Sequence, residues 1–117
     1  MESQLKAGDW AVFPRGGGEV GHMGVQIAKA MGFRVIAIDG GGDKRKLCEK
    51  LECEAFVDFT TVKSVEEEVM RITGIGAHGI FVAAGSAAAY RSAPQMVRIG
   101  GRVMCIGLRE FNDMWKE

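Results

Sequence analysis

Three glycines with the spacing G-x-G-x-x-G have the clearest chemical use in this chain: Gly16, Gly18 and Gly21. The first permits a sharp turn, the second leaves room for a pyrophosphate, and the third lets a helix pack closely against a strand. The N–H groups of a helix that starts near Val20 would then point toward the phosphates. A tight glycine loop without a ligand is the alternative when this motif is considered alone.

An acidic residue at the end of the next apolar run adds to this motif. Asp39 follows Gly21 by 18 residues, close to the interval of about 20 residues expected for a ribose-binding acid. A carboxylate there accepts hydrogen bonds from the ribose hydroxyls and repels the 2′-phosphate of NADP. By itself, Asp39 is equally consistent with a turn before Gly40. Together with the glycines, it predicts a site for NAD rather than NADP.

A lysine lies close to this acid. Lys44 follows Asp39 by five residues, within reach of the ribose or a phosphate. The run Lys44-Arg45-Lys46 is equally consistent with a solvated helix face, so both interpretations stay open.

These residues need strands and helices to position them, and the chain alternates between the two. Five apolar, β-prone runs predict strands: Trp10–Phe13, Arg34–Asp39, Ala55–Phe59, Gly79–Ala84 and Arg102–Gly107. The first intervening helix has apolar residues at three- and four-residue spacing from Val20 to Met31 and ends at Gly32.

Capping residues predict three further helices. Asp43 precedes a segment with Leu47, Cys48 and Leu51 on one face, and Ser64 forms a capping box with Glu67 in a helix that ends at Gly74. Ser86 precedes a helix that Pro94 should kink or divide.

Strict alternation of strands and helices predicts an α/β, doubly wound parallel sheet with strand order 3-2-1-4-5. We expect a dinucleotide-binding domain over residues 1–108 and a short tail over 109–117. The tail has no strand pattern, so a sixth strand is expected to be missing. The fifth strand, around Val103–Ile106, would then be an exposed apolar edge through which two copies could form a homodimer.

Charge and composition exclude several classes of partner. The 15 basic and 15 acidic residues cancel, so no long-range field favours nucleic acid or an anionic membrane. The N-terminus resembles no signal peptide and no apolar run is long enough to span a bilayer, which predicts a cytoplasmic protein. Cys48, Cys53 and Cys105 form no C-x-x-C pair and are expected to be buried, small apolar groups.

A run of motifs resembles a known family. GDWAVFPRGGGEVGHMGVQIAKAMGFRVIAID, GGGDKRKLCEKL, AFVDFT, GAHGIFVAAGSAAAY and VRIGGRVMCIGL are similar to the coenzyme domain of zinc-dependent, medium-chain alcohol dehydrogenases of the microbial and fungal type. The resemblance runs from about Leu5 to Leu108.

The resemblance implies roles for individual residues. It assigns the pyrophosphate turn to the three glycines, a position near the nicotinamide to Val20, and the adenosine ribose to Asp39 and Lys44. It also implies that the ends of the fourth and fifth strands line the nicotinamide side: Ala83, Ala84, Ile106 and Gly107.

Three departures from the family accompany this resemblance. Family enzymes bind catalytic zinc through cysteine and histidine ligands of a separate domain and its junction with this one, and no such ligands are found here. Glu19 replaces a glycine of the turn, where its charge opposes the pyrophosphate by roughly 1 kcal/mol when well solvated, unless Arg15 pairs with it or with a phosphate. Glu52 replaces a glycine after a helix, at a position where a left-handed backbone is common.

We therefore expect the NAD-binding domain of an alcohol dehydrogenase, which does not oxidise alcohols by itself. Whether this chain counts as an enzyme is left open. The alternative is a non-catalytic, divergent module that acts as a scaffold or interaction protein, which Glu19 and Glu52 favour. A methyltransferase that uses a similar loop for S-adenosylmethionine is a third, less supported option.

Overall fold

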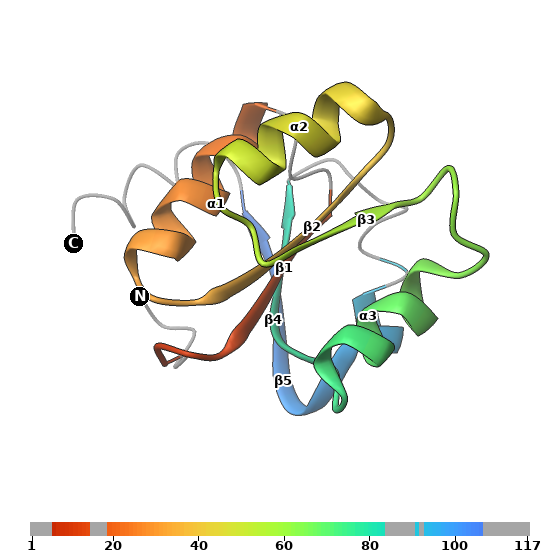
Figure 1. Ribbon diagram of the computed structural model, residues 1–117. Helices are drawn as coiled ribbons and strands as arrows, with labels where there is room; N and C mark the ends of the chain where they lie inside the picture. Colours follow the sequence, from red (N-terminus) through yellow and green to blue (C-terminus); the bar gives the residue numbers. More distant parts are fainter. Residues whose placement is uncertain (1–5, 15–18, 84–90, 92, 107–117) are drawn as a thin grey trace.

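The computed structural model describes residues 6–14, 19–83, 91 and 93–106. Within these residues, five strands form one parallel sheet in the order β3-β2-β1-β4-β5. The strands are β1 (Trp10–Pro14), β2 (Arg34–Asp39), β3 (Ala55–Asp58), β4 (Ala77–Ala83) and β5 (Val97–Ile106). The predicted fold class, strand number and strand order are thus confirmed (Figure 1). The homodimer through the edge of β5 stays a prediction.

Helices connect these strands within the described part of the chain. They are α1 (Glu19–Ala30), α2 (Gly42–Lys50), α3 (Val65–Thr73) and the short 3-10 turn η1 (Ala93–Gln95). The predicted N-cap of α3 is confirmed, because the Ser64 hydroxyl accepts a hydrogen bond from the Glu67 N–H at 3.2 Å. The helix predicted after Ser86 begins outside the described residues.

The start of α2 corrects the prediction that Asp43 is its cap. Gly41 is the N-cap, with φ 97° and ψ 156°, and Asp43 lies in the first turn. The chain enters the helix through a backbone conformation that glycine adopts at little cost. Asp43 is thereby placed near the positive end of the helix dipole instead of accepting a capping hydrogen bond.

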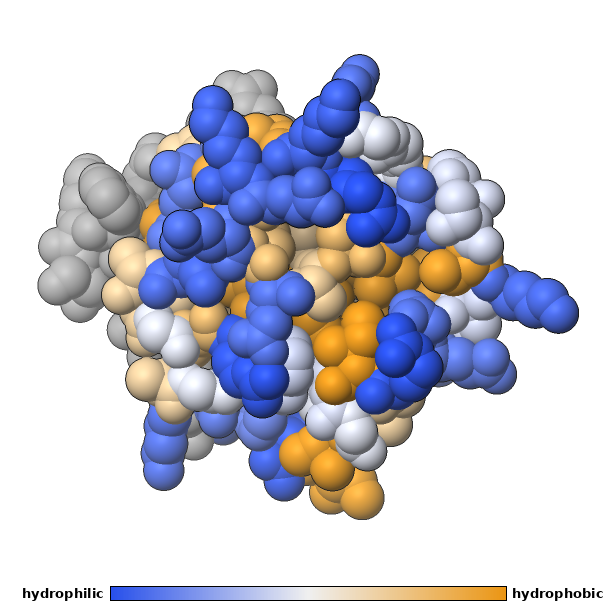
Figure 2. Space-filling view, viewed as in Figure 1, coloured by the Kyte–Doolittle hydropathy of each residue, from blue (hydrophilic) through white to orange (hydrophobic). Residues whose placement is uncertain are grey.

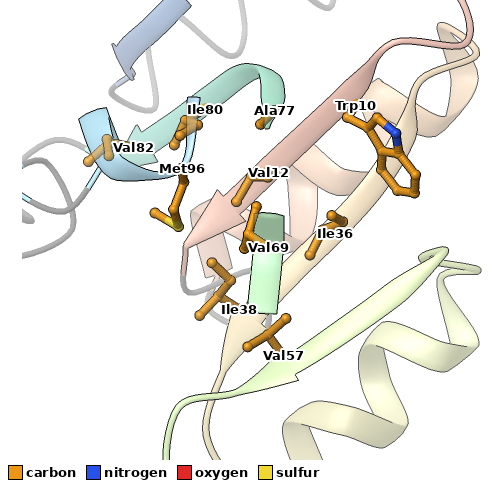
Figure 3. Packing of buried hydrophobic residues seen from close by; sticks show 11 residues of the cluster. Trp10, Val12, Ile36, Ile38, Val57, Val69, Ala77, Ile80, Val82 and Met96 are labelled. Carbon is orange, nitrogen blue, oxygen red and sulfur yellow. The ribbon is translucent and has the colours of Figure 1, made fainter. Parts of the chain in front are cut away.

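The two faces of the sheet are covered by different helices, and alternate residues of β1 point to each. One cluster includes Trp10 and Val12 of β1, Val69 of α3, and Met96 (Figure 3). The other cluster combines residues of α1 with the sheet: Ala11, Phe13, Val25, Ile27, Ala28, Phe33, Val35 and Phe81. Apolar residues on both faces explain why the strand sequences are almost continuously apolar.

Figure 2 shows hydrophilic residues over most of the visible face, with smaller apolar areas between them. No helix in the described ranges has the length and apolar character needed to cross a membrane.

Two strands begin earlier than predicted. Strand β5 begins at Val97 rather than Arg102, and β4 begins at Ala77 rather than Gly79. The register between them is irregular near its start: Ala77 pairs with Val97, whereas Gly79 pairs with Arg102. An irregularity of this kind interrupts the alternation of side chains by which strands are found in a sequence. The first half of β5 therefore carried no strand pattern.

Gly101 allows the two strands to approach at this irregularity. A Cβ atom at Gly101 would lie 2.5 Å from Val97 Cγ2 and 2.9 Å from the Ala77 carbonyl oxygen. Both distances are shorter than normal van der Waals contacts, and the Ala77 oxygen belongs to the backbone and cannot rotate away.

Gly101→Ala is therefore expected to lower the free energy of unfolding by about 1–3 kcal/mol, through overpacking. The matched control is Gly42→Ala, since a Cβ at Gly42 meets nothing within 4 Å. Urea unfolding followed by tryptophan fluorescence measures both variants. Equal stability of the two would contradict the packing described for the irregular part of β5.

Candidate functional site

The carboxyl ends of the parallel strands lie at one edge of the sheet, and several of the predicted site residues that the structure describes are found at this edge. Pro14 at the end of β1 pairs with Ile38, the residue before Asp39 in β2. On the other side of β1, the last pair of β4 and β5 is Ala83 with Ile106. Asp39, Ala83 and Ile106, which come from distant parts of the sequence, thus share this edge (Figure 1).

The order of the strands creates a topological switch point at this edge. β1 lies between β2 and β4; α1, which leads from β1 to β2, packs on one face of the sheet, and α3, which leads from β3 to β4, packs on the other. The chain thus leaves the centre of the sheet in opposite directions from β1 and β4. In open α/β sheets, ligands bind outside the carboxyl ends of the strands at such a switch point.

The first turn of α1 belongs to the same edge, because only residues 15–18 separate it from the end of β1. The predicted residues Glu19, Val20 and Gly21 are the first three of this helix. Their backbone N–H groups are among those that an α-helix leaves without an intrahelical acceptor. A helix with its N-terminus at this edge supplies N–H donors and a partial positive charge to an anion.

Asp39 is half-buried as the last residue of β2. Its Oδ1 accepts a hydrogen bond from the Gly40 N–H at 2.9 Å. That bond fixes the carboxylate at the start of the glycine turn, beside the end of β1.

Asp58, at the end of β3, is a residue of the site that sequence reasoning missed. It pairs with Asp39 in the sheet and is buried. Its Oδ1 accepts hydrogen bonds from the Thr60 N–H at 2.9 Å and the Thr60 hydroxyl at 2.5 Å, and its Oδ2 accepts one from the Gly41 N–H at 3.4 Å. Asp58 therefore ties the glycine turn after Asp39 to the neighbouring strand.

These hydrogen bonds favour the charged form of Asp58. The bonds from the Thr60 hydroxyl and N–H lower the pKa of the Asp58 carboxyl, with smaller contributions from the Gly41 N–H and the charge of Arg45, against the opposing effect of burial. The available signal in the sequence was an aspartate two residues before a threonine at a strand end, a combination typical of turns that close on their own side chain.

Phe59 and Thr60 hold the other side of the same turn. A Cβ atom at Gly40 would lie 3.0 Å from Phe59 Cζ and 3.1 Å from Thr60 Cγ2. The backbone that follows Asp39 is thus packed against the end of β3.

Lys44 is half-buried in the first half of α2, the helix that this turn opens into. The site therefore brings Asp39, the glycine turn and Lys44 together along one stretch of chain. Four predicted residues lie outside the described ranges and stay predictions: Gly16, Gly18, Ala84 and Gly107.

His78 occupies the opposite edge of the sheet. Its Nδ1 accepts a hydrogen bond from the Trp10 N–H at 2.9 Å, and its Nε2 lies 3.6 Å from Asp9 Oδ1. It satisfies a backbone donor at the start of β1 and is remote from the carboxyl edge.

Across the described ranges, no three histidine, cysteine, aspartate or glutamate side chains converge as a metal site would require. The residues described here therefore do not fit a catalytic zinc ion.

Fold and site together define a Rossmann-type α/β domain. The model of the family described as "Zinc-binding dehydrogenase" matches residues 20–114, and the chain belongs to this family.

Similar proteins include full-length dehydrogenases. "Alcohol dehydrogenase 1" of Emericella nidulans is 39% identical over 109 residues, which cover 92% of this chain and 31% of that protein. The structure of alcohol dehydrogenase TADH from Thermus sp. ATN1 superposes with a TM-score of 0.81 at 28% identity, over 92% of this chain and 31% of the other. The structure of an "NAD-dependent alcohol dehydrogenase" superposes with a TM-score of 0.80 at 30% identity, over 89% of this chain and 30% of the other. The chain thus spans about a third of the length of its relatives.

Asp58→Asn tests the link between β3 and the glycine turn. We expect the midpoint of thermal unfolding at pH 7 to fall by about 5 °C, because hydrogen bonds to a charged acceptor are weakened. The pKa of Asp58 is lower in the folded protein than the ordinary carboxyl pKa of 3.8. The charge of Asp58 therefore contributes fully to the stability of the fold at pH values above 3.8. This contribution is lost as the pH falls through the lowered pKa of the folded protein.

The difference between the wild-type chain and Asp58→Asn should therefore shrink in the most acidic buffers in which the protein stays folded. Calorimetry over a series of buffers measures it, and Glu49→Gln, which removes an exposed carboxylate near the end of α2, is the control. A difference that stays constant down to the acid limit would contradict the role of the Asp58 charge.

Proposed function

We propose that this domain binds NAD in the crevice at the carboxyl ends of β1 and β4, as the coenzyme-binding part of an alcohol dehydrogenase. The observation that carries the proposal is the position of Asp39, half-buried at the end of β2 and next to the switch point. The family match and the name of one relative, an NAD-dependent alcohol dehydrogenase, support it.

In this proposal, the pyrophosphate lies against the start of α1. Gly16 and Gly18 leave space for it, Gly21 allows α1 to pack closely on β1, and the N–H groups of the first helical turn donate hydrogen bonds to its oxygens. The helix start at Glu19, directly after the glycine segment, supports this arrangement.

The adenosine ribose lies beside Asp39. Its two hydroxyls donate hydrogen bonds to the Asp39 carboxylate, and the Lys44 ammonium group contacts the ribose or a phosphate. The same carboxylate repels the additional phosphate of NADP and so gives a preference for NAD. Asp58 acts through the glycine turn as a positioning residue.

The nicotinamide extends to the other side of the crevice, toward Val20, Ala83, Ala84, Ile106 and Gly107. When bound, NAD supplies the acceptor for a hydride from the substrate. The residues of this chain bind and orient the cofactor, and no step of the reaction is assigned to a metal here, because the described residues do not form a metal site.

Asp39→Asn should weaken the binding of NAD by about 10- to 100-fold, because a hydrogen bond to a charged acceptor contributes about 1.5–3 kcal/mol. Binding of NADP should change less or improve, since the repelling charge is gone. Isothermal titration calorimetry with both dinucleotides measures the two affinities.

The control is Asp43→Asn, the same chemical change on an exposed residue of α2. If Asp39→Asn binds NAD with unchanged affinity, the ribose does not hydrogen-bond to Asp39. If the unaltered chain binds no dinucleotide at millimolar concentration, the proposal fails and the alternative, a non-catalytic interaction module, takes its place.

Glu19→Gln tests whether the acidic residue at the start of α1 limits affinity. Removing the charge should strengthen NAD binding by about fivefold, the equivalent of roughly 1 kcal/mol for a solvated like-charge contact. Glu49→Gln, exposed near the other end of α2, is the control in the same titration. Equal or weaker binding by Glu19→Gln would mean that Glu19 does not oppose the phosphates.

A further inference from the structure

The C-terminal end of α2 closes with a pair of backbone hydrogen bonds that defines its geometry. The Glu52 N–H donates to the Glu49 carbonyl at 3.0 Å, and the Cys53 N–H donates to the Cys48 carbonyl at 3.1 Å. Glu52 between them has φ 65°, as predicted for this position. This is a Schellman motif, in which a left-handed residue turns the chain back over the last helical turn.

A Schellman motif brings two particular side chains into contact, and here both are cysteines. The residue third from the helix end and the second residue after the cap usually form an apolar contact. In α2 these positions are Cys48, which is buried, and Cys53, which is half-buried against the core cluster of α1. The two thiols are close enough for each to shift the pKa of the other. The expectation of buried apolar cysteines is therefore confirmed for Cys48 and corrected for Cys53.

The surroundings shift the pKa values of the two thiols in opposite directions. The hydrogen bond from Cys53 lowers the pKa of the Cys48 thiol despite burial; the charge of Lys44 acts in the same direction and that of Asp39 in the opposite one. The same hydrogen bond and burial raise the pKa of Cys53 well above its usual range. Cys48 is thus the thiol that ionises first, and Cys53 is the proton donor beside it.

We propose that Cys48 and Cys53 form a reversible redox pair, which hydrogen peroxide closes into an intramolecular disulfide. The proposal rests on the helix-end geometry, and its test does not require that the domain binds NAD. It assigns a modification site to the C-terminus of α2.

The chemistry needs one peroxide for two thiols. The Cys48 thiolate attacks one peroxide oxygen, the O–O bond breaks, and hydroxide leaves, which gives Cys48 sulfenic acid. The Cys53 sulfur then attacks the Cys48 sulfur; its proton and the departing hydroxyl group form water, and the S–S bond remains. The two thiols lose two electrons and two protons, and the peroxide is reduced to two molecules of water.

Access to Cys48 comes from its place at a helix end. Helix termini open locally with a smaller free energy than the core of a domain, and Cys53 on the outer side of the pair is already partly exposed. A small oxidant thus reaches the pair during brief openings of the last turn of α2.

The test is peptide mapping of the whole chain after treatment with hydrogen peroxide and alkylation of the remaining thiols. Trypsin cleaves after Lys50, between the two cysteines, so a disulfide holds peptides 47–50 and 51–63 together. We expect this linked pair to be the main product, to lack the mass of two hydrogen atoms, and to separate after treatment with dithiothreitol.

The Cys105→Ser variant removes the third cysteine and is expected to give the same linked peptides. Cys53→Ser in that background should instead accumulate sulfenic acid on Cys48, which dimedone traps. Alkylation of both Cys48 and Cys53 after peroxide treatment would overturn the proposal, and so would a disulfide to Cys105 or oxidation of either thiol to sulfinic acid without linkage. The mapping of the unaltered chain decides the question even if a variant fails to fold.

Discussion

The burial of β1 on both of its faces is the constraint on which the rest of the structure depends. All five of its residues are buried, although the strand is too short to form a core by itself. Covering both faces requires helices on opposite sides of the sheet, and these are α1 and α3. Because the connections run in opposite directions from the centre, the sheet acquires a switch point between β1 and β4. The candidate site is thus a consequence of how the core is built.

A second contact keeps the two strands at the switch point together. The rings of Phe13 in β1 and Phe81 in β4 are stacked, with centroids 4.9 Å apart and planes 7° from parallel. Aromatic pairs contribute about 0.5–1.5 kcal/mol beyond the area they bury. The switch point therefore lies at the end of two strands that are joined both by hydrogen bonds and by side-chain packing.

The sequence predicted the fold well where secondary structure follows local periodicity. Buried parallel strands are continuous apolar runs, and glycines separate them, so β1, β2 and the strand order could be inferred. The first half of β5 could not, because its register with β4 shifts and Gly101 is explained by the close approach of Val97 and Ala77. The cap of α2 was missed for a related reason: Gly41 acts through its backbone, which leaves no pattern of side chains.

The candidate site shows the same division. Asp39 was predicted from its spacing from the glycine motif, since that spacing is set by one helix and one strand, and its role stays a prediction. Asp58 was missed, because its importance arises from a neighbour in the sheet that is distant in sequence. The contact between Cys48 and Cys53 also needed coordinates, although the left-handed backbone at Glu52 was anticipated from the family resemblance.

That left-handed backbone has a consequence for how the domain tolerates change over generations. A side chain in this conformation costs about 1 kcal/mol relative to glycine, and Glu52 is exposed at a helix end, away from the carboxyl edge of the sheet. Natural proteins keep such imperfections while their stability stays above the level that function demands. Position 52 is thus a place where the domain can gain stability. A change to glycine there would offset a destabilising substitution elsewhere, and it would leave the contacts at the proposed cofactor site unchanged.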